Sequence, residues 1–273
     1  DYKIEMVNLT KLMSLKNRRA IITGANGHIG RIIALTLAEL GADLILVDRP
    51  GPDNKKLINE ITSNFKIDVQ THNCDLGIQN DLNKTISDIR KKGIPLNIIV
   101  NSAAFVGDTK LEGWVTDFEN QSVETWRSAI EVNLTSAFSL IQGLTPLLKK
   151  SEGASIINIG STYGSWGPDH RLYDETKMGN PAAYAASKGG LIQLTRWLAT
   201  TLASSNIRVN TLSPGGVFRN QPDIFVQKYN ARTPLGRMAT EDDFRGAIAY
   251  LASDLSSYVT GQNLAVDGGW GIW

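Results

Sequence analysis

The chain has 273 residues, of which 42% are hydrophobic and 20% are charged, and these proportions are typical of a globular protein with a full core. Its 28 basic residues nearly balance its 27 acidic ones, which excludes a strongly basic nucleic-acid or membrane-surface binder. One cysteine, Cys74, allows no internal disulfide, and three scattered histidines supply no metal-ligand spacing. We expect a cytoplasmic protein, because we find neither a signal peptide nor an apolar run of membrane-spanning length.

Residues 1–14 show no periodicity, and we expect them to form a poorly ordered extension. The apolar run 20–22 predicts a strand that leads into Thr-Gly-Ala-Asn-Gly-His-Ile-Gly at 23–30. Apolar residues then recur at helical steps until Gly41. A strand, a glycine turn and a helix together favour dinucleotide binding, because the bare backbone and the free N–H groups of the helix can approach a pyrophosphate.

A second strand is predicted over 44–47 and ends at Asp48. An acidic residue about 20 residues beyond the glycine turn is placed to accept hydrogen bonds from the adenosine ribose. Because it would repel a 2′-phosphate, Asp48 favours NAD over NADP, whereas the neighbouring Arg49 favours the opposite. A helix is predicted over 53–65 and a strand over 69–72. Asp75, which follows them, is interpreted either as a contact to the adenine edge or as a helix N-cap.

The rest of the chain continues the alternation of strands and helices. The run 96–100 predicts a strand buried on both faces, and 122–148 predicts one long helix that contains Asn133. Further strands are predicted at 155–159, 208–212 and 263–266, with helical patterns near 222–229 and 240–253. Seven strands alternating with helices predict one α/β domain over 15–273. Its sheet is doubly wound and mostly parallel, with helices on both faces.

The run 182–203 predicts a helix that begins with Tyr-Ala-Ala-Ser-Lys at 184–188. Residues four apart share a helix face, so the phenol of Tyr184 and the ammonium of Lys188 point into the same space. A nearby cation favours the phenolate of a tyrosine, whose ordinary pKa is about 10. The pair therefore predicts a proton donor and acceptor for neutral pH. Alone the pattern is weak, since amphipathic surface helices contain it by chance.

Several motifs occur in a fixed order along the chain. They are the glycine turn, Asp48, Asn-Ser-Ala-Ala at 101–104, Asn133, Ser161, Tyr184 with Lys188, Pro214-Gly215, and Val-Asp-Gly-Gly-Trp at 266–270. In this order and spacing the chain resembles the compact short-chain dehydrogenases/reductases over almost its whole length. The resemblance implies a Rossmann-type fold and hydride exchange between a nicotinamide cofactor and a carbonyl or secondary alcohol. It also implies a homo-oligomer, a dimer or a tetramer.

The resemblance also implies roles for single residues. Ser161 orients the substrate carbonyl, and Tyr184 is the acid/base. Lys188 lowers the pKa of Tyr184 and holds the nicotinamide ribose, and Asn133 holds a water in the proton path. Asn101 lies over the adenosine end or braces the sheet. The expected cofactor contacts are Gly24, Asn26, Gly27, His28, Ile29, Gly30, Asp48, Asp75, Leu76, Asn101, Ala103, Tyr184, Lys188, Pro214, Gly215 and Val217, and no metal is expected.

Three positions depart from the usual family pattern. Compact members carry Thr-Gly-x-x-x-Gly-x-Gly, whereas here His28 takes the place of the middle glycine, which falls one residue earlier at Gly27. That spacing resembles the extended branch, whose members often handle nucleotide sugars. Ala104 replaces a glycine and removes backbone room near the cofactor. The threonine that commonly follows Pro-Gly is absent, and Arg219 stands near its place.

Residues 164–181, called the insert below, separate Ser161 from Tyr184 by more residues than compact members usually have. The insert is polar and charged, which favours a polyhydroxylated or anionic substrate such as a sugar derivative. Similar insertions occur in oxidoreductases of flagellin and surface-sugar modification, which the chain resembles here. A solvated hairpin or an oligomer contact is an equal alternative. Within the insert, Tyr173 and Lys177 repeat the Tyr-x-x-x-Lys spacing without a helical pattern.

Three hypotheses for the function remain open. The first is an NAD-dependent oxidoreductase acting on a sugar or another polar small molecule, in which Arg219, Arg232 and Arg237 are candidates to bind an anionic group. The second is an NADPH-dependent 3-oxoacyl-type reductase, against which Asp48 and the charged insert both argue. The third is a non-catalytic nucleotide-binding scaffold, which only the altered glycine turn and Ala104 favour.

Overall fold

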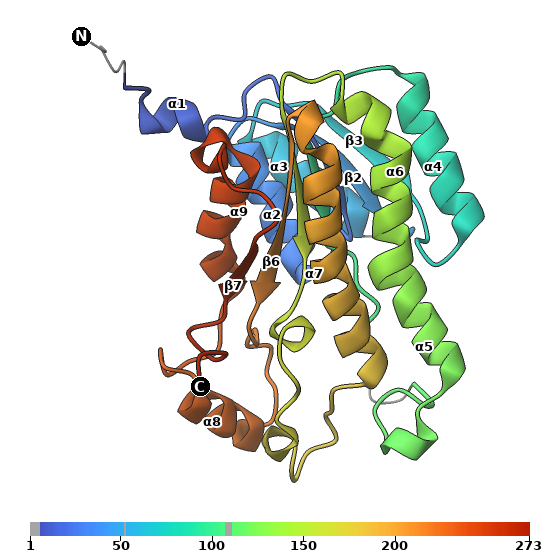
Figure 1. The fold of residues 1–273 in the computed structure, drawn as a ribbon, viewed down its shortest axis with the longest axis vertical. Coiled ribbons are helices and arrows are strands. Elements are labelled where there is room, and N and C mark those ends of the chain that lie inside the picture. Colours follow the sequence, from blue (N-terminus) through green and yellow to red (C-terminus); the bar gives the residue numbers. More distant parts are fainter. Residues whose placement is uncertain (1–5, 52, 107–110) are drawn as a thin grey trace.

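The computed structural model describes residues 6–51, 53–106 and 111–273. Its seven strands form a single sheet in the order β3-β2-β1-β4-β5-β6-β7, and every pair of neighbours is parallel (Figure 1). The predicted doubly wound α/β fold is therefore confirmed. The direction of winding reverses between β1 and β4, and ligands of open α/β sheets bind beside the carboxyl ends of the strands at such a point.

The strands are short, and those at the centre of the sheet are fully buried. They are β1 (Arg19–Thr23), β2 (Asp43–Asp48), β3 (Val69–Asn73), β4 (Ile98–Asn101), β5 (Ala154–Ile159), β6 (Ile207–Pro214) and β7 (Asn263–Val266). Every residue of β4 and of β5 is buried, because helices cover both faces of a parallel sheet. The pairing of β1, β4 and β5 brings Thr23, Asn101 and Asn158 side by side at their carboxyl ends.

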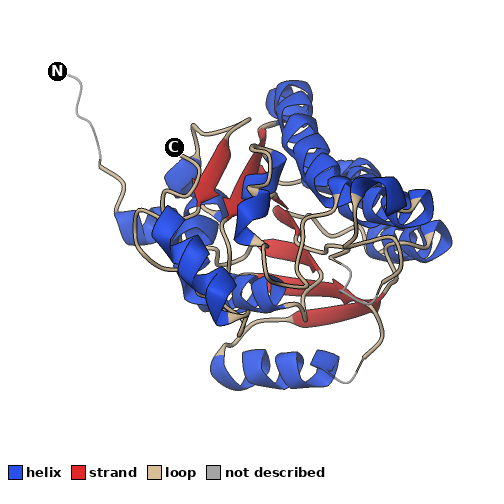
Figure 2. Cartoon of the chain, turned by 90° about the horizontal axis from the view of Figure 1, so that it is seen from below, coloured by secondary structure: helices blue, strands red, loops and turns tan. Residues whose placement is uncertain are grey.

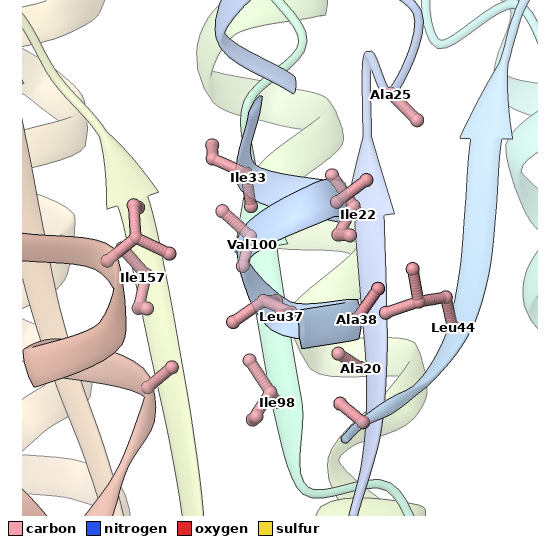
Figure 3. Close-up of a cluster of buried hydrophobic side chains, with 14 of the residues drawn as sticks. Ala20, Ile22, Ala25, Ile33, Leu37, Ala38, Leu44, Ile98, Val100 and Ile157 are labelled. Carbon is pink, nitrogen blue, oxygen red and sulfur yellow. The ribbon is translucent and has the colours of Figure 1, made fainter. Parts of the chain in front are cut away.

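Two layers of helices enclose this sheet (Figure 2). The helices are α1 (Leu9–Met13), α2 (His28–Glu39), α3 (Asp53–Asn64), α4 (Gln79–Lys91), α5 (Val123–Ile130), α6 (Ser136–Leu148), α7 (Ala182–Leu202), α8 (Asp223–Arg232) and α9 (Arg245–Ala252). Apolar side chains of α2, α3 and α9 form one core cluster with the strands, and those of α4, α6 and α7 form the other. Figure 3 shows Ile33 and Leu37 of α2 lying over Ile22 and Val100 of the sheet.

The N-terminal segment contains an element for which the sequence shows no periodicity. Residues 9–13 form the short helix α1, and Leu15 immediately after it is completely buried in the core. Residues 1–5 of the predicted extension lie outside the described residues. Among the residues that are described, no helix is both long enough and apolar enough to cross a bilayer.

The helix predicted over 122–148 is continuous but not uniform. A π-helical turn at Glu131–Thr135 joins α5 to α6, and Asn133 lies within it. Such a turn holds one extra residue, so it shifts the faces of the helix on either side. The amide of Asn133 is thereby buried between the helix, the loop after β4 and α7.

Candidate active site

A large cleft of about 1490 Å³ opens at the carboxyl ends of the central strands. The glycine turn, Asp48 and Lys188 are among the residues that line it. Of the residues predicted to contact the cofactor, the cleft is lined by Gly24, Asn26, Gly27, His28, Ile29, Gly30, Asp48, Asp75, Leu76, Ala103, Tyr184, Lys188, Pro214, Gly215 and Val217. The fold thus gathers at one site residues that lie up to almost 200 positions apart in the chain.

The glycine turn is held tightly, and two of its glycines have no room for a side chain. Gly24 has a φ of +66°, and a Cβ there would lie 2.6 Å from the Cα of Ala103. A Cβ on Gly30 would lie 2.0 Å from the carbonyl oxygen of Gly24, because α2 starts directly against the turn. The first turn of α2 therefore presents bare backbone to the cleft, as a dinucleotide pyrophosphate requires.

His28, which takes the place of the usual middle glycine, begins α2 at the edge of the cleft. Its side chain is 68% exposed, and its Nδ1 lies 3.6 Å from Oε1 of Glu241. The imidazole is thus largely exposed at the edge of the cleft, beside Glu241.

Asp48 is fixed at the end of β2 by two backbone N–H groups. Asn26 of the glycine turn donates to one carboxylate oxygen at 2.7 Å, and Arg49 donates to the other at 2.7 Å. A carboxylate oxygen can accept a second hydrogen bond, so this side chain can still bind hydroxyl groups in the cleft. Asp48 is therefore bonded to the glycine turn and lines the cleft, where the sequence predicts that the adenosine ribose binds.

Asp75 and Asn101 have local roles that the sequence left open. The carboxylate of Asp75 accepts a hydrogen bond of 2.9 Å from Gly77, and the N-cap of α4 is Ile78, so the N-cap interpretation of Asp75 is wrong. Asn101 donates to Asn158 at 2.8 Å and does not line the cleft within the described part of the chain. It braces β4 against β5, which is one of its two predicted roles, and its contact with the cofactor stays a prediction.

Tyr184, Lys188 and Ser161 meet at the centre of the cleft, as predicted. Tyr184 and Lys188 lie one turn apart on α7, and the hydroxyl of Ser161, which follows β5, lies close enough to the phenol of Tyr184 to lower its pKa. The Nζ of Lys188 donates to the carbonyl of Ile159 at 2.7 Å and lies 5.8 Å from the centroid of the Tyr184 ring. One hydroxyl, one phenol and one amine thus share a single site.

The electrostatics of this group differ from the prediction. Burial raises the pKa of Tyr184, although the Ser161 hydroxyl and the charge of Arg219 act in the opposite direction. Burial also lowers the pKa of Lys188, to about 8. The expected lowering of the tyrosine pKa by Lys188 is therefore wrong for this structure, because desolvation of the phenol outweighs nearby positive charge. A phenol with a raised pKa keeps its proton at neutral pH.

Replacing Lys188 with methionine is expected to stabilise the protein in the absence of ligands by up to about 2 kcal/mol at pH 7. The pKa of Lys188 in the fold, about 8, lies below its ordinary value of 10.5, so between these pH values the unfolded chain binds more protons. The stability of the unsubstituted protein therefore rises with pH across that window, and the advantage of the variant shrinks. Urea unfolding at pH 7 and at pH 10 measures this difference, and an advantage that grows with pH would contradict the argument.

Asn133 is engaged at both ends of its amide. Its Oδ1 accepts a hydrogen bond of 2.6 Å from the N–H of Phe105, and its Nδ2 donates to the hydroxyl of Ser187 at 2.9 Å. These contacts join the π-helical turn to the cleft wall and to α7, so Asn133 braces the site. Its role in holding a water molecule stays a prediction.

A second, smaller cavity of about 350 Å³ adjoins the cleft, and we call it the side pocket. Ser161, Tyr184, Pro214 and Gly215 line both cavities, so the two meet at the predicted catalytic residues. The side pocket is also lined by Trp114, Tyr163, Tyr173, Met178, Asn180, Phe225 and Tyr229. Sequence reasoning missed this aromatic lining, because its members come from four separate segments with no common motif.

The insert forms one wall of the side pocket and contacts α8, at the lower end of the molecule in Figure 1. Its charged residues Arg171, Asp174, Glu175 and Lys177 are exposed, whereas Leu172 is buried. The charges of the insert thus face solvent, and the insert contributes Tyr173, Met178 and Asn180 to the side pocket. Tyr173 and Lys177 do not repeat the catalytic pair, because they lie in a turn and not on a helix.

The candidate arginines separate into one cleft residue and two structural ones. Arg219 lines the cleft, and its Nε lies 3.2 Å from Oε1 of Glu241. Arg232 pairs with Asp169 of the insert at 2.5 Å, and its guanidinium lies 4.3 Å from the centroid of the Trp270 ring. Arg237 makes two hydrogen bonds of 2.7 Å to Asp243. Arg127, which sequence reasoning did not single out, also lines the cleft.

The described residues hold no group of three or more His, Cys, Asp or Glu side chains arranged to bind a metal ion.

Comparison with known proteins gives consistent matches. A family model described as enoyl-(acyl carrier protein) reductase matches residues 24–271. Post-translational flagellin modification protein A of Campylobacter coli is 32% identical over 258 residues, which cover 94% of this chain and 100% of that protein. The 3-oxoacyl-acyl-carrier-protein reductase FabG of Thermotoga maritima is 30% identical over 263 residues, which cover 94% of this chain and 99% of that protein.

Solved structures extend these matches to the fold and its ligands. A short chain dehydrogenase from Leptospira borgpetersenii with bound NAD+ has a TM-score of 0.82 at 31% identity, covering 99% of this chain and 98% of that one. A gluconate 5-dehydrogenase from Burkholderia cenocepacia in complex with NADP and tartrate has a TM-score of 0.84 at 26% identity. The match covers 97% of this chain and 100% of that one. The chain belongs to the short-chain dehydrogenase/reductase family, and it is an NAD(P)-dependent oxidoreductase.

Proposed function

We propose that this protein uses NAD to move a hydride to or from the carbonyl or secondary alcohol carbon of a compact polar molecule, of the size of a sugar. The observation that carries this proposal is the position of Ser161 and Tyr184, which line both the cleft and the side pocket. A cofactor in the cleft and a substrate in the side pocket would therefore meet at these two side chains.

The residues of the cleft fit a nicotinamide dinucleotide. The glycine turn offers a backbone surface that a Cβ at Gly24 or Gly30 would obstruct, and this suits close approach by a pyrophosphate. Lys188 has three N–H donors, and one of them is used by Ile159. The others are available to ribose hydroxyls, because Lys188 lines the cleft. The bound cofactor supplies or receives the hydride, and the protein supplies orientation and the proton.

Each catalytic side chain has a defined task in this proposal. In the direction of reduction, the phenol of Tyr184 donates its proton to the carbonyl oxygen of the substrate. The hydroxyl of Ser161 donates a hydrogen bond to the same oxygen as negative charge develops on it. In the direction of oxidation, Tyr184 accepts the proton of the alcohol. Because Ser161 already contacts Tyr184, a substrate oxygen between them can contact both groups.

Replacing Asp48 with alanine is expected to lower the preference for NAD over NADP by about 10- to 100-fold. The variant loses a carboxylate that accepts hydrogen bonds from ribose hydroxyls and repels a 2′-phosphate. The ratio of kcat/KM with the two cofactors measures the effect. Asp53→Ala, an exposed residue at the start of α3, is the matched control and is expected to leave the ratio unchanged. An unchanged ratio in Asp48→Ala would refute the assigned role.

A second candidate function is an NADPH-dependent 3-oxoacyl-type reductase. It is supported by the similarity to FabG of Thermotoga maritima and by the NADP in a related structure. A panel of sugars, sugar phosphates, nucleotide sugars and a 3-oxoacyl thioester, assayed with NAD and NADP in parallel, separates the two. Turnover of the thioester alone, with NADPH, would favour the second candidate, and cofactor binding without any turnover would favour a scaffold. The cytoplasmic location and the assembly into dimers or tetramers stay predictions.

A further inference from the structure

The side pocket has a wall built from aromatic rings and phenol groups. Tyr173 of the insert lies 5.5 Å from Phe225 of α8, and Phe225 lies 5.8 Å from Tyr229, measured between ring centroids. Flat rings of this kind cover the face of a ligand ring, and polar groups at their edges fix its orientation. The volume of about 350 Å³ suits a single small ring.

Two phenols in this wall share a hydrogen bond. The hydroxyls of Tyr163 and Tyr173 lie 2.6 Å apart, and the side chain of Asn180 lies close enough to Tyr173 to lower its pKa. Burial raises the pKa of both phenols, so both keep their protons at neutral pH. A bond between two hydroxyl groups uses one of their two protons, so one phenol proton remains to be donated elsewhere.

An acceptor without a partner lies in the same wall. The Oδ1 of Asn180 is buried and has no hydrogen-bond partner among the described residues. Buried polar atoms are normally hydrogen-bonded, so an unpaired acceptor beside a spare donor indicates a place for a ligand group. A hydroxyl group is the simplest group that satisfies both, because it donates one hydrogen bond and accepts others.

We propose that Tyr173 and Asn180 bind a second hydroxyl group of the substrate, so that the substrate is a compact ring with a hydroxyl group besides its reacting carbonyl or alcohol. This inference rests on the proposed function, because Tyr184 and Ser161, which line the same pocket, set where the reacting oxygen lies. Tyr173 and Asn180 are then the residues of the insert that determine specificity.

The test compares cyclohexanol with cyclohexane-1,2-diol, -1,3-diol and -1,4-diol. Binding to the protein with NAD is measured by titration calorimetry, and oxidation is measured by the appearance of NADH. At least one diol is expected to bind the unsubstituted protein about 5- to 100-fold more tightly than cyclohexanol. Tyr173→Phe keeps the ring and removes the hydroxyl, so it is expected to abolish most of this preference.

Tyr258→Phe is the matched control, because Tyr258 is fully exposed and does not line the side pocket. It is expected to keep the preference for the diol. The inference is overturned if no diol binds better than cyclohexanol, or if the preference survives in Tyr173→Phe. A diol preference that depends on Tyr173 without any NADH formation would support the second hydroxyl site and contradict the oxidoreductase assignment of these side chains. A failure of the second hydroxyl site can thus be distinguished from a failure of the proposed function.

Discussion

Replacing Tyr184 with phenylalanine is expected to lower kcat by about 100- to 10,000-fold, the usual contribution of a positioned proton donor. The phenol is the group that contacts Ser161 and borders both the cleft and the side pocket. Phenylalanine keeps the ring and removes only the oxygen that carries the proton. The affinity for NAD is expected to stay roughly the same, because the glycine turn, Asp48 and Lys188 are untouched.

Steady-state kinetics and NAD titration measure the two halves of this prediction. Tyr250→Phe serves as the control, since Tyr250 lies on α9 and does not line the cleft. Normal turnover in Tyr184→Phe would remove the phenol from the mechanism. A simultaneous loss of NAD affinity would assign it a binding role instead.

Replacing Gly30 with alanine is expected to destabilise the fold by about 1–3 kcal/mol and to abolish measurable NAD binding. The added Cβ would lie 2.0 Å from the carbonyl oxygen of Gly24, which is far closer than atoms in contact. The turn cannot simply retreat, because Gly24 donates a hydrogen bond of 2.9 Å to the carbonyl of Val47 and packs against Ala103. The backbone N–H groups that face the cleft must therefore move.

Gly246→Ala makes the same chemical change where there is space. Gly246 lies in α9, and a Cβ there would meet nothing within 4 Å. Alanine favours a helix over glycine by about 1 kcal/mol, so this control is expected to be neutral or stabilising. Urea unfolding and NAD titration of both variants provide the measurement. Equal stability and equal NAD affinity in Gly30→Ala would contradict the close approach in the turn.

The architecture could be predicted from the sequence, because the order of strand and helix patterns allows few sheet topologies. Alternating apolar strands and helices leave a parallel doubly wound sheet as the natural arrangement, and the structure confirms it. The π-helical turn around Asn133 could not be predicted in the same way. One extra residue in a long apolar pattern shifts the hydrophobic face only slightly, so periodicity alone does not reveal it.

Site residues could be predicted where their position follows from the spacing within one helix or turn. Tyr184 and Lys188 share a face because they are four apart on a helix, and Gly24 and Gly30 face the cleft because a strand meets a helix there. The pKa of Tyr184 depends instead on burial by distant segments, which spacing does not encode. The residues of the insert that line the side pocket could not be predicted for a related reason, since composition does not show which side chains turn inward.

The contact of Arg232 with Asp169 and Trp270 ties together three segments that are far apart in sequence. Trp270 in turn stacks on Tyr229 and lies edge-on to Tyr163, both of which line the side pocket. If residues 164–181 were replaced by the corresponding loop of another family member, the new loop would lack the side chains that pack against Arg232 and Trp270. Engineering a new substrate range therefore requires exchanging residues 164–181, α8 and the last turn of the chain as one unit.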